Sequence, residues 1–201
     1  TTHQEDIAAA HDPGSAPEIY MSATLPPCPV NRDALMAYLD ACGIESKTID
    51  HPPLFTVDDS QKLRGNIEGG HTKNLFLKDK KGNFFLLTAQ EDTVVNLKTL
   101  HKLLGGASRF SFGNAERMEE FLGVTPGAVT AFGIINDRQG AVKFAIDQRL
   151  LDHEKINCHP MTNDATTTLL CSDLLSFARA CGHDPQIVDL SIDPNSSAAH
   201  D

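Results

Sequence analysis

The sequence predicts a single α/β domain with a mixed, mostly antiparallel sheet that is flanked by helices. Helical and strand patterns alternate along 201 residues, which is enough chain for one well-filled core. Apolar runs bracket the turn-rich segments DKKG, at 79–82, and DRQG, at 137–140, and so predict two hairpins. Because hairpins pair strands antiparallel, these two exclude a purely parallel, doubly wound sheet.

The N-terminal half begins with a predicted helix over residues 31–43, for which Asn31 is a suitable N-cap and Gly43 a suitable end. The alternating segment IESKTID then suits a strand, the prolines of HPPLFT break it, and VDDSQKLRG suits a short helix. The first hairpin pairs KNLFLKD with NFFLLTA. After it, NLKTLHKLLGG predicts a helix with its leucines on one stripe.

The C-terminal half continues the alternation. NAERMEEFLG predicts a helix capped by Asn114, and the loop GVTPGAVTAFG leads into the second hairpin, GIIND with AVKFAID. KINCHP and ATTTLL predict strand segments. CSDLLSFARACG predicts a final helix capped by Ser172 and ended by Gly182, and QIVDL predicts a last strand.

The net charge of −10 is concentrated at the two ends of the chain. Residues 1–20 and 184–201 each carry four acidic residues and no Lys or Arg. Residues 62–109 instead hold nine Lys and Arg against four Asp and Glu. A basic patch can therefore lie on a nearly neutral domain, although lysines solvated in turns would give the same composition.

Composition also predicts the domain limits and the compartment. Residues 1–28 are expected to be a disordered acidic leader and 191–201 a disordered tail, which leaves 29–190 as the folded domain. No apolar run approaches the roughly 20 residues that cross a bilayer, and the N-terminus lacks the features of a signal peptide. Five scattered cysteines favour a reducing compartment over a disulfide framework. We therefore expect a cytoplasmic protein without membrane contact.

Common site signatures are missing from the sequence. There is no phosphate-binding GxxxxGK[ST] or GxGxxG loop and no HExxH, and none of the nine histidines has a His or Cys partner four residues away. We accordingly predict neither a cofactor nor a metal. Cys158 and His159 are adjacent on a predicted strand, where neighbouring side chains point to opposite faces, so they do not form a nucleophile pair.

Four motifs carry the functional prediction. HPPLFTVDD, at 51–59, makes a rigid elbow before an apolar corner, and GGHTKNLFL, at 69–77, places a Lys-Asn pair at the entrance of a hairpin. GVTPGAVTAFG, at 123–133, contains glycines and a proline that can leave N–H groups free for a ligand oxygen. CHPMTNDATTTL, at 158–169, is a polar run between two strands. Taken singly, each is better explained by structure alone: HPPLFTVDD and GVTPGAVTAFG as connections, Lys73 as a solvent-facing lysine at a strand start, and CHPMTNDATTTL as the cap of a sheet edge.

Together and in this order, the four motifs resemble the YbaK/prolyl-tRNA synthetase-associated domain family, over about residues 31–190. The match is most specific to its free-standing alanyl-tRNA(Pro) deacylase branch. The resemblance implies a barrel-like sheet and an ester hydrolase that clears mischarged tRNA(Pro), which serves the fidelity of translation. The implied partners are the acceptor end of tRNA(Pro) and the prolyl-tRNA synthetase. Ala128 and Ala131 depart from a Ser and a Pro that relatives often carry.

The resemblance also assigns roles to residues. Lys73 takes the position of the family's essential lysine, and Asn74 is its neighbour. Residues 123–127 take the place of a substrate loop lined by backbone, and His159 falls on the histidine that shapes the aminoacyl pocket. Lys73 and Asn74 are thus the predicted catalytic residues. The predicted substrate-binding residues are Phe55, Thr56, Gly123, Pro126, Gly127, Ala128, Phe132, His159 and Thr166.

Three other functions stay open on the sequence alone. The first is a non-catalytic tRNA-binding or regulatory protein of the same fold, and the second is a deacylase of cysteinyl-tRNA(Pro). The third is a small-molecule esterase or thioesterase that uses Cys158 or His159. DNA binding is not expected, because the chain has no helix-turn-helix and no basic recognition helix.

Overall fold

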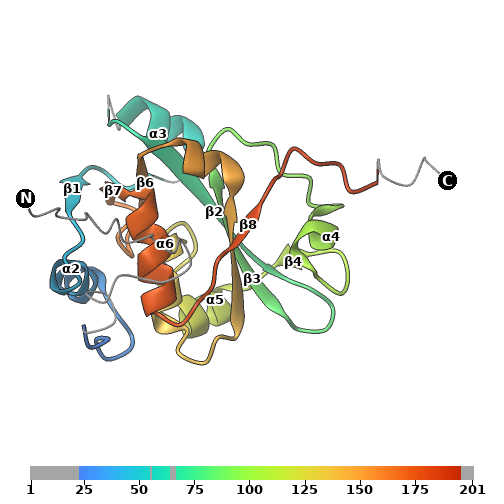
Figure 1. Ribbon diagram of the computed structural model, residues 1–201, viewed down its shortest axis with the longest axis horizontal. Helices are drawn as coiled ribbons and strands as arrows, with labels where there is room; N and C mark the ends of the chain where they lie inside the picture. The colour runs from blue at the N-terminus through green and yellow to red at the C-terminus, as the bar shows by residue number, and fades with distance from the viewer. Residues whose placement is uncertain (1–22, 55, 64–66, 196–201) are drawn as a thin grey trace, which may run out of the picture.

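The computed structural model describes residues 23–54, 56–63 and 67–195. Within these residues eight strands form one sheet in the order β1-β7-β6-β2-β3-β5-β8, with β4 paired to β2 (Figure 1). The strands are β1 (Ser46–Asp50), β2 (Gly70–Lys78), β3 (Phe84–Gln90), β4 (Ser111–Phe112), β5 (Val142–Asp147), β6 (Lys155–Cys158), β7 (Ala165–Leu170) and β8 (Gln186–Val188).

The predicted mixed sheet is confirmed. Four strand pairs are antiparallel (β1–β7, β6–β7, β2–β3 and β2–β4) and three are parallel (β2–β6, β3–β5 and β5–β8). The strand order runs from β1 to β8, so the sheet has two ends. The helices are α2 (Arg32–Ala41), α3 (Val57–Leu63), α4 (Leu100–Leu104), α5 (Ala115–Leu122), α6 (Cys171–Ala180) and the 3₁₀ helices η1 (Ala131–Asn136) and η2 (Gln148–Asp152).

The first predicted hairpin, β2–β3, is present, and Asp79 organises its turn. The Asp79 carboxylate accepts hydrogen bonds from the backbone N–H groups of Lys81 (2.9 Å), Asn83 (3.0 Å) and Ala107 (3.0 Å). Gly82 takes the positive φ of +83° that closes the turn, a conformation in which a Cβ is unfavourable. The turn residues DKKG therefore act as the sequence predicted.

The second predicted hairpin is wrong. Residues 131–136 form η1 instead of a strand, and β5 pairs in parallel with β3. The Thr130 side chain caps η1 by accepting a hydrogen bond from the Phe132 N–H (3.3 Å). A Cβ added to Gly133 would lie 3.0 Å from the Cβ of Leu122, so glycine lets η1 approach α5 closely. A short apolar run suits a buried helix as well as a strand, and here packing on α5 decides.

Predicted helix caps are right at two of three positions. The Asn31 side chain accepts from the Ala34 N–H and that of Asn114 from the Arg117 N–H, both at 2.9 Å. Ser172 is not a cap, because α6 starts one residue earlier and its N-cap position makes no side-chain hydrogen bond. Strand β7 runs directly into α6, which leaves no intervening loop for a capping residue.

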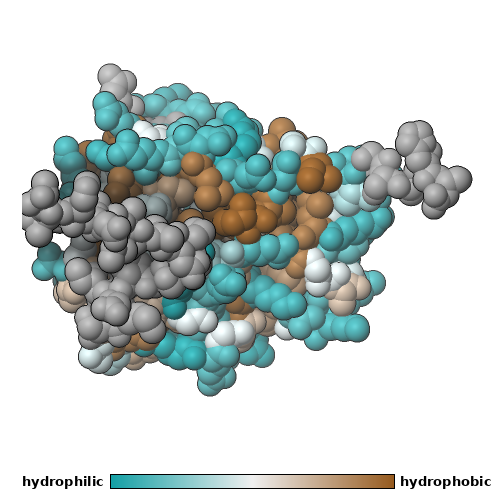
Figure 2. Space-filling model, viewed as in Figure 1, coloured by the Kyte–Doolittle hydropathy of each residue, from teal (hydrophilic) through white to brown (hydrophobic). Residues whose placement is uncertain are grey.

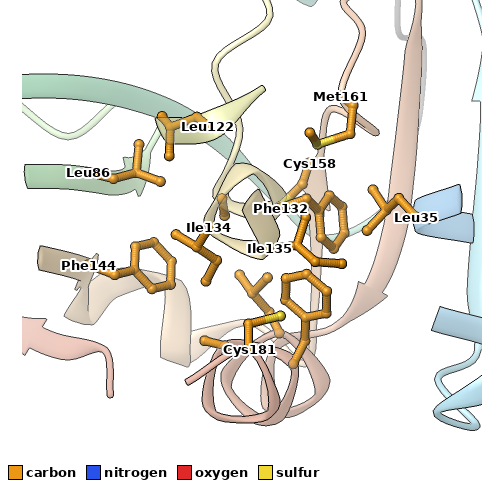
Figure 3. Packing of buried hydrophobic residues seen from close by; sticks show 14 of the residues in the cluster. Leu35, Leu86, Leu122, Phe132, Ile134, Ile135, Phe144, Cys158, Met161 and Cys181 are labelled. Atoms are coloured by element: carbon orange, nitrogen blue, oxygen red, sulfur yellow. The ribbon is translucent and has the colours of Figure 1, made fainter. Parts of the chain in front are cut away.

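The sheet has an apolar cluster on each face, and β2 contributes to both. Phe76 belongs to the larger cluster, which also includes side chains from α2, α5, η1 and α6. Figure 3 shows part of this cluster, with Leu35 of α2, Leu122 of α5 and Ile134 of η1. Leu77, the next residue, belongs to the smaller cluster, with side chains from α4. Because successive strand residues point to opposite faces, odd-numbered residues of β2 lie on the side of the smaller cluster.

The ends of the described chain contact the domain. Residues 1–22 and 196–201 of the predicted leader and tail lie outside the described residues. Leu25 packs against the larger cluster, the Arg138 guanidinium donates to the Pro26 carbonyl (2.5 Å), and the Lys102 ammonium donates to the Asn195 side chain (2.6 Å). Both stretches are therefore attached where the structure describes them.

Hydrophobic side chains gather on one surface over β8, where Ile187 is 42% exposed (Figure 2). None of the described helices is both long and apolar enough to span a bilayer.

Candidate active site

The first and fourth motifs pack against each other. The His51 N–H donates to the Asp164 carbonyl (2.9 Å), and the Leu54 N–H donates to the Asn163 carbonyl (3.1 Å). The His51 Nε2 lies 2.9 Å from the Thr166 hydroxyl. The rigid corner at 51–54 is therefore bound to the loop that joins β6 to β7, and a histidine and a threonine from distant segments become neighbours.

The tautomer of His51 follows from its second contact. Its Nδ1 lies 2.9 Å from the Pro52 carbonyl oxygen, and a carbonyl can only accept, so Nδ1 carries a hydrogen. In the neutral ring Nε2 then accepts, and the Thr166 hydroxyl donates to it. Thr166 is buried, so its side chain is held in a single orientation towards His51.

His159 is half-buried, and among the described residues its Nε2 has no hydrogen-bond partner. Its Nδ1 lies 3.1 Å from the Ala165 carbonyl, which makes Nδ1 the donor and leaves the lone pair on Nε2. Burial lowers the pKa of His159, the nearby His51 lowers it further, and the bond to Ala165 acts in the opposite direction. At neutral pH the ring is therefore uncharged and able to accept a hydrogen bond at Nε2.

The third motif reaches the same place through a buried threonine. The Thr130 hydroxyl donates to the His159 carbonyl (2.6 Å) and so ties the glycine-containing loop to the end of β6. Earlier in the loop, Pro126 and Gly127 (φ +90°) occupy the two middle positions of an exposed turn from Thr125 to Ala128, as in a type II turn.

Two residues of this loop, Ala128 and Gly123, have structural roles that the sequence did not predict. The Ala128 N–H donates to the Thr125 carbonyl (3.0 Å), so it is not free to meet a substrate oxygen. Gly123 ends α5 with a φ of +65°, and a Cβ there would lie 2.4 Å from the Asn136 amide nitrogen. That amide donates to the Leu122 carbonyl (3.0 Å), so Gly123 makes room for a packing contact.

The second motif, on β2, runs beside β6. Gly70 pairs with Ile156 and His71 with Asn157 in parallel register. The Thr72 hydroxyl also donates to the Asn157 carbonyl (2.7 Å). The start of β2 and the end of β6 are therefore side by side, which brings the strand that bears Lys73 next to the segment that bears His159.

Lys73 is partly buried, and its ammonium donates to the Thr93 carbonyl. Asn74 is on the opposite face of β2, where its side-chain oxygen accepts from the Thr88 hydroxyl (2.6 Å) on β3. Lys73 pairs with Ala89, on the side of the smaller cluster. The structure thus places Lys73 and Asn74 back to back and does not bring their side chains together.

The remaining predicted residues fall in three environments. Phe55 lies outside the described residues. Thr56 is exposed and accepts from the Asp59 N–H (3.0 Å) at the start of α3. Phe132 has 0% exposure and lies within the larger cluster (Figure 3). It packs edge-on against Phe177, with ring centroids 5.4 Å apart. Phe132 is therefore a core residue and does not present a surface to a ligand.

A buried polar network beside Lys73 was not predicted. The Asp147 carboxylate accepts from the Thr93 hydroxyl (2.7 Å), the Gln90 N–H (3.1 Å) and the Arg149 N–H (3.1 Å). The Arg149 guanidinium donates to the Thr93 hydroxyl oxygen (3.0 Å). Sequence reasoning had no signal for this network, because Thr93 and Asp147 are 54 positions apart and neither lies in a motif.

The thiol of Cys158 is not a nucleophile in this environment. It is fully enclosed on the side of the larger cluster, and burial raises its pKa to about 12, so the thiolate is scarcely populated at neutral pH. The burial of the thiol therefore argues against an esterase or thioesterase that uses Cys158 as its nucleophile. In the described part of the chain no group of three or more His, Cys, Asp or Glu side chains is arranged to hold a metal ion.

Comparison with known proteins places these residues in a family. The family model "Aminoacyl-tRNA editing domain" matches residues 51–177. Prolyl-tRNA synthetase associated domain-containing protein 1 of Mus musculus is 40% identical over 162 residues, which cover 79% of this chain and 95% of that protein. Prolyl-tRNA editing protein ProX of Acetoanaerobium sticklandii is 32% identical over 160 residues, which cover 79% and 97%.

The fold has solved counterparts as well. A protein described as a candidate trans-editing enzyme for prolyl tRNA synthetase superposes with a TM-score of 0.55 at 19% identity, over 72% of this chain and 86% of that one. This likeness supports the fold alone. The family match covers all four motifs, and the chain belongs to the aminoacyl-tRNA editing domain family.

Proposed function

We propose that this protein is a trans-editing hydrolase that removes alanine from mischarged alanyl-tRNA(Pro). The observation that carries the proposal is the packing of His51, Thr166 and His159 at the ends of β6 and β7, beside the strand that bears Lys73. The 32% identity to a prolyl-tRNA editing protein, over nearly its whole length, supports tRNA(Pro) as the substrate.

The chemistry fits a site without a strong nucleophile. An aminoacyl ester is already activated, so an enzyme need only orient water and stabilise the oxyanion that forms at the carbonyl. The water oxygen adds to the ester carbon, the bond to the terminal ribose oxygen breaks, and that oxygen leaves with a proton. We assign the Lys73 ammonium to the ester region or the terminal phosphate, and a ribose hydroxyl of the substrate to orienting the water.

His159 and Thr166 are assigned to the aminoacyl pocket. The neutral His159 ring offers Nε2 as a hydrogen-bond acceptor, and the Thr166 hydroxyl is fixed on His51. Alanine is then accepted and proline rejected by size. One or two methylene groups are worth only about 1–3 kcal/mol in an apolar pocket, whereas steric exclusion of a ring can exceed that. A cysteinyl ester, close to alanyl in size, is the second candidate substrate.

The basic segment 62–109 is assigned to the phosphates of the acceptor stem. Its lysines at positions 80, 81, 98 and 102 are exposed, as binding to phosphates requires. The reaction would take place where tRNA is charged, in the cytoplasm, and would act on tRNA(Pro) released by the prolyl-tRNA synthetase.

The test is deacylation of alanyl-, cysteinyl-, seryl- and prolyl-tRNA(Pro) by the wild type, Lys73→Ala and Lys47→Ala. Lys47 is a matched control because it is an exposed lysine on β1, outside the basic segment. Alanine release that is lost only in Lys73→Ala supports the proposal. Release of cysteine or serine instead would keep the site and change the substrate. No release from any tRNA would overturn the proposal in favour of a non-catalytic tRNA-binding protein.

A further inference from the structure

A buried carboxylate next to the candidate site has no role in the proposed chemistry. Asp147 ends β5 and is only 1% exposed. A buried charge is costly unless hydrogen bonds compensate it, and Asp147 has three donors: the Thr93 hydroxyl and the N–H groups of Gln90 and Arg149. Among the described residues no Lys or Arg side chain forms an ion pair with it.

Thr93 connects this carboxylate to Lys73. The Thr93 N–H donates to the Gln90 carbonyl (3.0 Å), its hydroxyl donates to Asp147 (2.7 Å), and its carbonyl accepts from the Lys73 ammonium. All three polar groups of Thr93 are thus engaged. Because two of them are anchored on Gln90 and Asp147, the direction of the third, the carbonyl that receives Lys73, is set.

We propose that Asp147 is a positioning residue for Lys73 and that it acts through Thr93. A lysine side chain has four rotatable bonds, and its ammonium is useful to a reaction only where it is held. A neutral carbonyl holds the ammonium and leaves its positive charge intact, whereas a carboxylate in direct contact would cancel that charge. Asp147 fixes the direction of the Thr93 carbonyl. Its negative charge is separated from the Lys73 ammonium by Thr93 alone in the hydrogen-bond network. The inference rests on the proposed role of Lys73.

A purely structural role for Asp147 makes different predictions. Asp147 also caps η2 by accepting from the Arg149 N–H, so its loss should destabilise the protein in any case. Two matched controls separate the roles. Thr48→Val removes a part-buried threonine hydroxyl that lies 2.8 Å from the Thr167 hydroxyl. Asp137→Asn alters a buried carboxylate bonded to the backbone N–H groups of Ala141 (2.9 Å) and Val142 (2.7 Å). Asp137 precedes β5 and Asp147 ends it, and both control residues lie outside the basic segment 62–109.

The experiment compares Thr93→Val, Thr93→Ser and Asp147→Asn with these controls. The single-turnover rate on saturating alanyl-tRNA(Pro), the Kd for uncharged tRNA(Pro) and the thermal midpoint are measured for each. We expect Thr93→Val and Asp147→Asn to lower the rate about tenfold, the scale of one charge-assisted hydrogen bond, with Kd changed less than twofold. Thr93→Ser should recover most of the rate. The controls should lower the midpoint without lowering the rate of the folded protein.

Wild-type rates in both Thr93→Val and Asp147→Asn would overturn the inference, and so would a Thr93→Ser variant as slow as Thr93→Val. If the wild type deacylates no tRNA, the proposed function fails. The positioning role of Asp147 is then tested by the position of the Lys73 ammonium. Its ¹⁵N resonance, assigned with Lys73→Ala, should shift in Thr93→Val and Asp147→Asn and stay unchanged in Thr48→Val and Asp137→Asn. An unchanged resonance in all four variants would show that Asp147 does not position Lys73.

Discussion

Replacing Thr130 with valine tests the connection between the glycine-containing loop and His159. Thr130 is fully buried, and its hydroxyl donates to the His159 carbonyl (2.6 Å) and accepts from the Phe132 N–H (3.3 Å). Valine has nearly the same shape, so the change opens no cavity. It removes one of the two hydrogen bonds to the His159 carbonyl, which keeps the bond from the Met161 N–H (3.0 Å), at a net cost of about 0.5–1.5 kcal/mol. It also removes a helix cap whose bond is long, which costs about 0.5–1 kcal/mol. We expect a loss of about 2 kcal/mol of unfolding free energy, or roughly 4–8 °C in Tm.

Urea titration and the deacylation rate together measure this effect. Thr130→Ser keeps the hydroxyl and deletes one buried methyl, so it should cost only about 1 kcal/mol and retain activity. Thr130→Val should in addition lower the rate on alanyl-tRNA(Pro), because the His159 carbonyl loses its hydrogen bond to the glycine-containing loop. A valine variant within about 0.5 kcal/mol of the wild type, or a serine variant as impaired as valine, would refute the reasoning.

Three further outcomes follow from individual contacts. Gly123→Ala should destabilise by about 1–2 kcal/mol in denaturant titration, because alanine disfavours a φ of +65° and its Cβ would meet the Asn136 amide. Hydrogen bonds led by that from Asn83 lower the pKa of Asp79 from 3.8 to about 2, so stability that is present above pH 4 should fall as the pH drops towards 2. Thermal melts should show that Asp79→Asn removes this part of the acid sensitivity. If two phosphates contact segment 62–109, tRNA affinity in filter binding should weaken about tenfold between 50 and 200 mM salt.

Local rules predicted the elements whose ends or turns are chemically marked. Asn31 and Asn114 begin helices as expected, and the DKKG turn joins β2 to β3 because Asp79 and Gly82 suit it. The segment at 131–136 has only an ambiguous mark, the Thr130 cap, because threonine is also common in strands. Its apolar run fits a buried strand and a buried helix equally well, and only the close approach of Gly133 to α5 selects the helix.

The motifs predicted which segments of the chain contribute to the candidate site, but not how their side chains are oriented. Bonds from His51 to Thr166 and from Thr130 to His159 join three motifs that the sequence shows only as separate connections. Motifs do not report which way a side chain points. Phe132 was a predicted substrate-binding residue, yet its position on η1 turns it towards Phe177 in the core.

The two faces of β2 explain why Lys73 and Asn74 stand together at the entrance of a buried hairpin. Both faces of this strand are covered by apolar clusters, so each polar side chain needs a partner on its own face. The Asn74 side chain accepts a hydrogen bond from the Thr88 hydroxyl in the adjacent strand, so its partner lies within the hairpin. The Lys73 ammonium donates to the Thr93 carbonyl, and Thr93 lies in a turn that is hydrogen-bonded to Asp147, which is distant in sequence. The strand pairing thus satisfies Asn74, whereas Lys73 depends on a network that reaches it from outside the hairpin. A substitution at Asn74 should therefore act mainly on stability, and one at Lys73 mainly on activity.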